Sequence, residues 1–214
     1  MPANLSSTSK IIDTILVLDF GSQYTQLIAR RVRDSNVYSE ILPWDIDEKK
    51  IQSINPKGII LSGGPDSVTD SYTPRIPQMI FDLNVPILGI CYGMQTLAEQ
   101  FGGQVISSEF KEFGYSELKV KTDCVLFSNL DKTLNVWMSH GDQVQDLPDN
   151  FDLVAASTSA PIAAMQHSTK PIYALQFHPE VTHTEDGKII LDNFLFKVCK
   201  ANSDWRMDDL INQR

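Results

Sequence analysis

The chain has 214 residues, a length that suits one domain built around a single sizeable hydrophobic core. Hydrophobic residues make up 42% and charged residues 21%, and the formal net charge of −9 argues against a broad nucleic-acid-binding face. No stretch is apolar and long enough to span a bilayer, the start has no signal-peptide core, and the three cysteines lack a spaced framework. We expect a cytoplasmic protein that binds neither nucleic acid nor membrane.

The first half of the chain alternates short β-rich runs with stretches of helical spacing. In chain order we expect a strand at 15–18, a helix at 24–33, a strand at 37–42, a helix at 46–54, a strand at 58–61, a helix at 74–83, a strand at 85–88 and a helix at 94–101. Such alternation predicts an α/β fold with a largely parallel central sheet and helices on both faces.

In the second half of the chain, the alternation of strands and helices gives way to a series of predicted strands. Its apolar or alternating runs predict further strands, the first four of them antiparallel additions to the sheet, at 118–121, 136–138, 153–156, 162–165 and 172–175. An amphipathic helix is expected at 187–199. We divide the chain into a flexible lead-in at 1–12, one domain at 13–201, and a linker or the start of a further domain at 202–214.

The thiol of Cys91 lies where a predicted strand meets a predicted helix. Gly89 and Gly93 flank it and permit a tight backbone approach, so the pattern is that of a nucleophile elbow with cysteine in place of serine. The N-terminal end of the following helix favours a thiolate. A free cysteine is more often a small buried hydrophobe, and we interpret Cys124 and Cys199 in that way.

His178 and Glu180 follow the predicted strand at 172–175. In an extended chain, residues two apart point to the same face, so an imidazole and a carboxylate would meet at the carboxyl end of a strand. An isolated pair of this kind would be a surface feature, but beside an elbow thiol it supplies a base and an orienting acid. The remaining histidines show no metal-ligand spacing with a cysteine, so we predict no metal.

Two polar segments allow more than one interpretation. Residues 62–67 could form a simple turn, a phosphate cradle or a loop whose N–H groups stabilise an oxyanion; Pro65 removes a donor and disfavours the cradle. Residues 139–142 could form a turn or grip a zwitterionic ligand, with Asp142 facing an ammonium group. Residues 19–21 are interpreted as a turn that ends a strand.

Several segments resemble a known family. The three motifs of class I (triad) glutamine amidotransferases are similar to Gly89–Gln95, Ser62–Pro65 and Phe177–Glu180. The amidotransferase domain of GMP synthases is similar to four further segments, Asp19–Tyr24, Glu112–Tyr115, Trp137–Asp142 and His178–His183. The resemblance covers residues 15–200 and implies a flavodoxin-like fold.

The resemblance also implies a mechanism. Cys91 would attack the side-chain amide carbon of glutamine, His178 would transfer the proton, Glu180 would orient the imidazole, and water would cleave the γ-glutamyl thioester. The amide N–H groups of Gly64 and Tyr92 would form the oxyanion hole. The residues expected near bound glutamine are Gly63, Gln95, Ser139, His140 and Asp142.

In the GMP synthase family the ammonia passes to an ATP-pyrophosphatase domain, in cis or as a separate subunit. That domain uses ATP and Mg²⁺ to convert XMP to GMP, the full-length protein is expected to be a homodimer, and residues 205–214 resemble the start of that domain. No cofactor is expected in this chain. The alternatives are an amidotransferase of anthranilate or aminodeoxychorismate synthesis, a non-catalytic module of the same fold, and a cysteine peptidase or γ-glutamyl hydrolase.

Overall fold

The computed structural model describes residues 12–206, and of residues 108–110 the backbone alone; the rest of the expected lead-in and residues 207–214 lie outside the described part. The strands are β1 (Thr14–Asp19), β2 (Tyr38–Pro43), β3 (Gly58–Leu61), β4 (Ile87–Ile90), β5 (Gln104–Val120), β6 (Thr133–Asp146), β7 (Phe151–Ala156), β8 (Ala164–His167) and β9 (Ile172–Leu175). The helices are α1 (Thr25–Asp34), α2 (Glu48–Ile54), α3 (Gln78–Asp82), α4 (Tyr92–Gln100) and α5 (Gly187–Asp192), with a 3₁₀ turn at Val125–Phe127 and a π-helix at Asn193–Val198.

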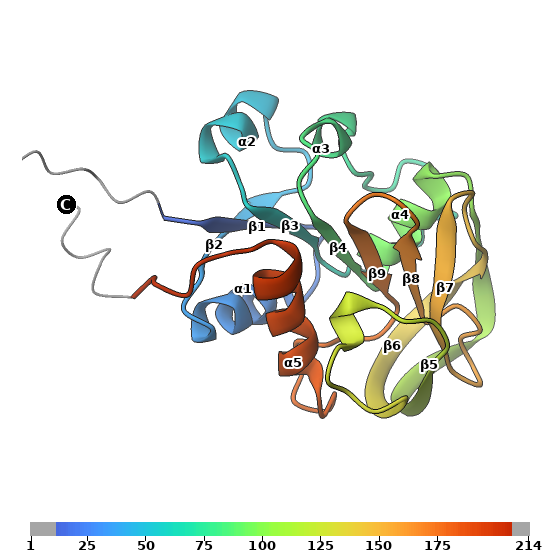
Figure 1. Ribbon diagram of the computed structural model, residues 1–214. Coiled ribbons are helices and arrows are strands. Elements are labelled where there is room, and N and C mark those ends of the chain that lie inside the picture. Colours follow the sequence, from blue (N-terminus) through green and yellow to red (C-terminus); the bar gives the residue numbers. More distant parts are fainter. Residues whose placement is uncertain (1–11, 207–214) are drawn as a thin grey trace, which may run out of the picture.

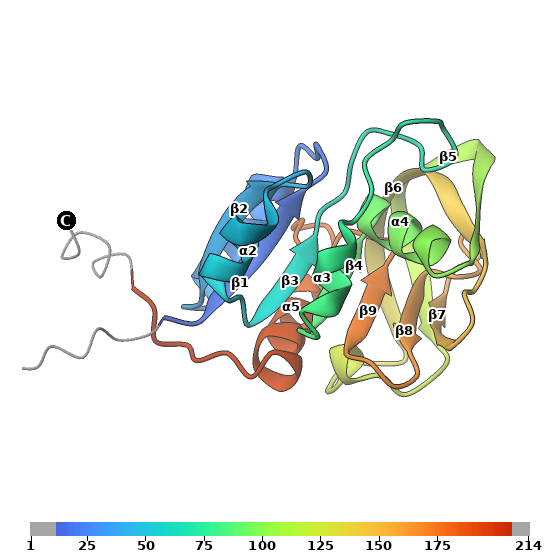
Figure 2. The same cartoon turned by 90° about the horizontal axis from the view of Figure 1, so that it is seen from above.

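Within residues 12–206 the strands form one sheet in the order β2-β1-β3-β4-β9-β8-β7-β5-β6 (Figures 1 and 2). The first five of these strands are parallel and follow the flavodoxin-like order. Their residues are almost continuously apolar because helices cover both faces: α1 and α5 lie on one side, and α2, α3 and α4 on the other (Figure 1). This confirms the expected fold class.

The antiparallel extension ends in a long ribbon made of β5 and β6 (Figure 2). Buried and more accessible residues alternate along β6, as expected for a strand with one face on the core. A register shift between Ser107 and Glu112 interrupts the ribbon. Although β6 is the edge of the sheet, the N–H of His178 donates to the carbonyl of Trp137 at 3.1 Å. The sheet therefore curls until its edge strand meets the segment that follows β9.

Several elements differ from the expected ones; the strands expected at 118–121 and 136–138, for example, are the much longer β5 and β6. The segment at 139–142 is no turn, because its residues are paired with β5 inside the ribbon. The helix expected at 74–83 is confined to α3, because the side-chain amide of Gln100 bonds both the N–H and the carbonyl of Ile76 and holds that residue outside a helix. The helix expected at 187–199 is α-helical in its first half and π-helical in its second.

The segment after the π-helix, which we interpreted as a linker or the start of a further domain, lies against the opposite edge of the sheet as far as it is described. Trp205 is 4% exposed, and its ring centroid is 5.8 Å from that of Tyr38 in β2. The backbone N–H of Trp205 donates to the carbonyl of Asn36 at 3.0 Å. Among the helices of residues 12–206, none is long and apolar enough to cross a membrane.

Candidate active site

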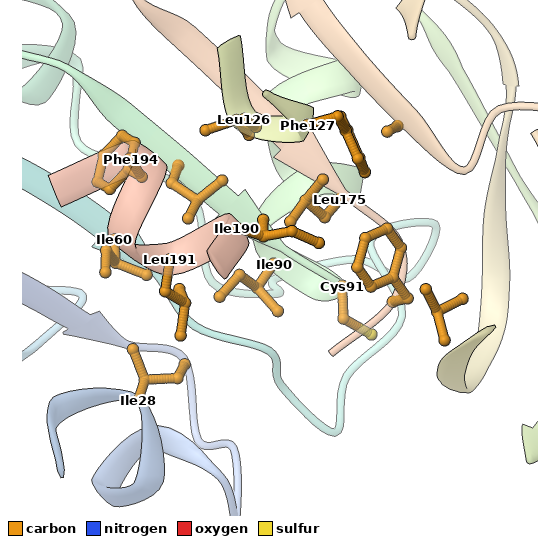
Figure 3. Packing of buried hydrophobic residues seen from close by; sticks show 14 of the residues in the cluster. Ile28, Ile60, Ile90, Cys91, Leu126, Phe127, Leu175, Ile190, Leu191 and Phe194 are labelled. Atoms are coloured by element: carbon orange, nitrogen blue, oxygen red, sulfur yellow. The ribbon is translucent and has the colours of Figure 1, made fainter. Parts of the chain in front are cut away.

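Cys91 occupies a sharp turn between β4 and α4. Its backbone has φ 52° and ψ −107°, a conformation that costs a non-glycine residue free energy and that the surrounding contacts enforce. The N–H of Cys91 donates to the carbonyl of Leu175 at 2.8 Å, and its carbonyl accepts the N–H groups of Met94 and Gln95. A Cβ atom at Gly93 would lie 2.6 Å from the carbonyl oxygen of Leu61. The turn is thus the expected elbow, with the sulfur at the border of the core (Figure 3).

His178 lies near this thiol, and Glu180 pairs with His178. The Nδ1 atom of His178 is 2.8 Å from Oε1 of Glu180, and the two residues are 3% and 0% exposed. The ring of Tyr24 meets the imidazole edge-on at a centroid distance of 5.2 Å. Burial works to lower the pKa of His178, but the Glu180 carboxylate and a hydrogen bond with Cys91 raise the pKa well above its ordinary value. A charged imidazole is therefore favoured in this site.

The site opens into a cavity of about 490 Å³ at the carboxyl ends of the parallel strands. The loops after β1 and β3 form one wall, at the point where the strand order reverses, which is where α/β sheets commonly bind ligands. Of the residues singled out in the sequence, the cavity is lined by Gly64, Cys91, Gln95, Ser139, His140, Asp142 and His178. The other three, Gly63, Tyr92 and Glu180, are not among the residues that line the cavity.

The loop after β3 is tied to the elbow. The N–H of Gly93 donates to the carbonyl of Ser62 at 3.1 Å, while the buried Ser62 hydroxyl accepts from the N–H of Phe20. Within the described residues, the backbone N–H groups of Gly64 and Tyr92 donate no hydrogen bond to the protein. Tyr92 is the first residue of α4, where such groups lack intrahelical partners. Both groups are free to donate to a ligand oxygen.

Strand β6 supplies polar groups to the facing wall of the cavity. The carbonyl of Ser139 lies 3.5 Å from Sγ of Cys91, and the carbonyl of Asp142 accepts from the side-chain amide of Gln95 at 2.8 Å. The Asp142 side chain is 7% exposed, and within residues 12–206 its Oδ2 atom has no hydrogen-bond partner. An uncompensated buried carboxylate oxygen beside a cavity is suited to a cationic ligand group.

His140 is held by two acceptors. Its Nδ1 atom lies 3.0 Å from the carbonyl of Asp142, and its Nε2 atom lies 3.1 Å from Oε2 of Glu112. The other carboxylate oxygen of Glu112 accepts from the hydroxyl of Ser159. Burial lowers the pKa of His140, an effect that the Glu112 carboxylate opposes. Glu112 therefore links His140 on β6 to the loop that contains Ser159.

The sequence interpretation missed part of the lining. Residues 21–24 border the cavity although we interpreted residues 19–21 as a simple turn, and Lys111 and Phe113 contribute from β5. Two signals could have found the first group: its place at the carboxyl end of a central strand, and its inclusion in a segment of the family resemblance. No such signal marks Lys111, because the register shift in β5 sets its position.

The other two cysteines differ from Cys91. Burial raises the pKa of Cys124 to about 11 and raises that of Cys199 further, so both thiols stay protonated at neutral pH. Neither lines the cavity. In residues 12–206, moreover, no three His, Cys, Asp or Glu side chains are grouped so that they could hold a metal ion.

Comparison with known proteins agrees with this architecture. The sequence model of the family described as glutamine amidotransferase class-I matches residues 16–198. A GMP synthase [glutamine-hydrolyzing] of Vibrio cholerae is 52% identical over 197 residues, which are 92% of this chain and 38% of that protein. The chain thus spans less than two-fifths of the length of this relative.

Solved structures share the fold. A candidate GMP synthase subunit from Thermoplasma acidophilum is 33% identical with a TM-score of 0.76, and the match covers 95% of this chain and 98% of that one. A glutamine amidotransferase from Thermotoga maritima has the same fold at 21% identity and a TM-score of 0.64, over 89% of this chain and 86% of that one. The chain therefore belongs to the class-I glutamine amidotransferases, in agreement with the resemblance noted in its sequence motifs.

Proposed function

We propose that this chain hydrolyses glutamine to glutamate and ammonia through Cys91, His178 and Glu180. The observation that carries the proposal is a thiol on a strained elbow, close to an imidazole that a buried carboxylate orients, beside a cavity. A nucleophile, a base and an orienting acid in this order are the components of covalent acyl-transfer catalysis.

In the proposed first step, the sulfur of Cys91 attacks the side-chain amide carbon of glutamine, and its proton passes to His178. Glu180 fixes the ring through Nδ1, which leaves Nε2 for proton transfer. The raised pKa of His178 supports this division of charge, because the imidazole then holds the proton until the leaving ammonia takes it.

The tetrahedral intermediate would place its oxyanion between the backbone N–H groups of Gly64 and Tyr92. Donors fixed in advance, one at the start of α4 and one in the loop after β3, would stabilise such a charge without reorganisation. Collapse of the intermediate releases ammonia and leaves a γ-glutamyl thioester on Cys91. Water, activated by the now neutral His178, then attacks the thioester and releases glutamate.

The α-ammonium group of glutamine would bind to Asp142, whose Oδ2 atom is buried and unpartnered within the described residues. Gln95 ties α4 to β6 through its bond to the Asp142 carbonyl, and Gly63, Ser139 and His140 complete the glutamine-binding set. The Asp142 carboxylate, an acceptor, thus suits the ammonium group of an amino acid.

We further propose that the ammonia serves the ATP-dependent amination of XMP to GMP. The support is the identity with a glutamine-hydrolysing GMP synthase, of which this chain matches 38%. ATP and Mg²⁺ would act in an ATP-pyrophosphatase domain, either linked to residues 202–214 or present as a separate subunit. The complete protein would be a cytoplasmic homodimer, and this chain itself would need no cofactor.

The test is the release of glutamate from glutamine by this chain, alone and after addition of a synthetase domain loaded with XMP and ATP. Strong stimulation is expected, with Cys91→Ala as the inactive control. If the loaded synthetase leaves the rate of glutamate release unchanged, the proposed role in GMP synthesis is contradicted. An amidotransferase of anthranilate or aminodeoxychorismate synthesis then becomes the favoured function. No labelling of Cys91 by an electrophilic glutamine analogue would instead identify a non-catalytic module.

A further inference from the structure

Thr184 lies in the segment that follows the proposed triad, outside the cavity and within the protein. Its side chain is buried, at 4% exposure. The hydroxyl donates to the carbonyl of His178 at 2.7 Å and accepts the backbone N–H of Trp137 at 3.0 Å. Both partners are backbone groups, so the contacts fix the course of the chain and not the orientation of another side chain.

A third hydrogen bond, between the backbones of His178 and Trp137, closes a ring with these two. The N–H of His178 donates to the carbonyl of Trp137 at 3.1 Å, so both backbone groups of each residue take part. In an ordinary strand pair the N–H of Trp137 would reach the facing carbonyl directly. Here the hydroxyl of Thr184 is inserted between them. The spacing between β6 and His178 is therefore set by one direct backbone bond and by one side-chain oxygen.

This spacing matters because β6 also faces the nucleophile. The carbonyl of Ser139, two residues beyond Trp137, lies 3.5 Å from Sγ of Cys91. The elbow is anchored separately, through the bond from the N–H of Cys91 to Leu175. Thr184 thus connects the imidazole to the strand that borders the thiol, while the thiol itself rests on the parallel sheet.

We propose that Thr184 is a positioning residue for glutamine hydrolysis, whose hydroxyl holds His178 at the distance from Cys91 that proton transfer requires. The inference rests on the proposed function. Without the hydroxyl, the N–H of Trp137 and the carbonyl of His178 each lose a buried partner, and the imidazole shifts away from the sulfur. A displacement of about 1 Å at a reacting group can cost on the order of 10²-fold in rate.

The experiment compares Thr184→Val, which keeps the shape and removes the hydroxyl, with Thr184→Ser, which keeps the hydroxyl. We expect Thr184→Val to lower kcat for glutamine hydrolysis roughly tenfold or more, with KM changed less than about threefold, because the glutamine contacts lie on other residues. Thr184→Ser should stay close to wild type. Thr182→Val, at an exposed threonine two residues away, is the matched control.

A second readout is the rate at which iodoacetamide alkylates Cys91, followed by mass spectrometry of its peptide. Thr184→Val should slow alkylation several-fold, and Thr184→Ser should not. This rate needs no glutamine, so it still tests the inference if the wild-type chain hydrolyses none and the proposed function fails.

Three outcomes would overturn the inference. In the first, Thr184→Val keeps kcat and the alkylation rate within about twofold of wild type; in the second, Thr184→Ser loses as much as Thr184→Val, which would assign the effect to the methyl group. Should Thr184→Val not fold, Thr184→Ala takes its place. The third outcome is failure of both to fold, with Thr184→Ser folded, which would make the hydroxyl a requirement of folding and not of positioning.

Discussion

The parallel half of the sheet and the β5–β6 ribbon contribute to the same cavity in different ways. The nucleophile sits on the parallel half, between strands that are buried along nearly their whole length. The ribbon is a two-stranded extension with one accessible face, a register shift, and exposed aromatic rings at Phe113 and Tyr115, which are 66% and 65% exposed. Its polar groups line the cavity opposite the thiol.

The parallel half fixes the thiol in a closely packed turn, whereas the ribbon presents polar groups from a less enclosed part of the sheet. The elbow is determined from several sides, by Leu61, Leu175 and the first turn of α4. The contacts that join the ribbon to the rest of the molecule include the bond between Gln95 and Asp142 and the bond between His178 and Trp137. Changes to the parallel half should therefore affect stability and kcat, whereas changes to the ribbon should affect KM.

The largest effect is expected for Cys91→Ala. Loss of the nucleophile should lower kcat for glutamine hydrolysis on the order of 10⁴-fold or more, while the free energy of unfolding stays close to wild type. In a complete protein supplied with added ammonia, the proposed amination of XMP should continue, because it no longer needs glutamine. Loss of the ammonia-driven reaction as well would mean that Cys91 is mainly structural.

The next largest effect is expected from a pair of glycine substitutions, one in the parallel half and one in the ribbon. Gly93→Ala places a methyl group 2.6 Å from the Leu61 carbonyl and should lower the free energy of unfolding by about 3 kcal/mol. Gly141→Ala, on the ribbon, meets only the flexible side chain of Lys111 at 3.6 Å or more, and should change stability by less than about 1 kcal/mol. Urea denaturation measures both; equal losses would remove the contrast between the halves.

On the ribbon itself, Asp142→Asn should act on substrate binding. It replaces the buried carboxylate by a neutral amide, so KM for glutamine should rise about tenfold or more with a smaller change in kcat. Steady-state kinetics separates the two constants. A fall in kcat at constant KM would instead indicate that Asp142 acts in the chemical step.

The smallest effect concerns Cys124, which lies away from the cavity. Burial raises the pKa of its thiol from 9.0 to about 11, so the folded state favours the protonated form. The resulting stability is present below pH 9 and is lost as the pH rises toward 11. The free energy of unfolding of wild type should therefore fall more steeply over this range than that of Cys124→Ala; parallel curves would contradict the burial effect.

The sequence predicts the parallel half well because local patterns determine it. Apolar runs, helical spacing and the glycines around Cys91 are sufficient to place each strand, the elbow and the edge where the site forms. Local patterns do not predict the strand at 139–142. A polar run that contains glycine resembles a turn, and only its pairing with β5 makes it a strand.

The contacts that brace the site are also invisible in the sequence. Arg31 donates from Nε to the carbonyl of Glu180 at 2.9 Å, and Thr184 bonds two backbone groups, although neither residue belongs to a motif. Bonds from a side chain to a distant backbone group impose no residue spacing, so no periodicity reveals them. Their partners become evident only once the chain is folded.

The ring of bonds at Thr184 has one more consequence, for the association of separate molecules. Strand β6 is the outer strand of the sheet, and an outer strand with free N–H and carbonyl groups can pair with another chain. At Trp137 both groups are occupied by His178 and Thr184. The segment proposed for catalysis thus also blocks intermolecular pairing of β6 at Trp137, so loosening it would expose these two groups to another chain.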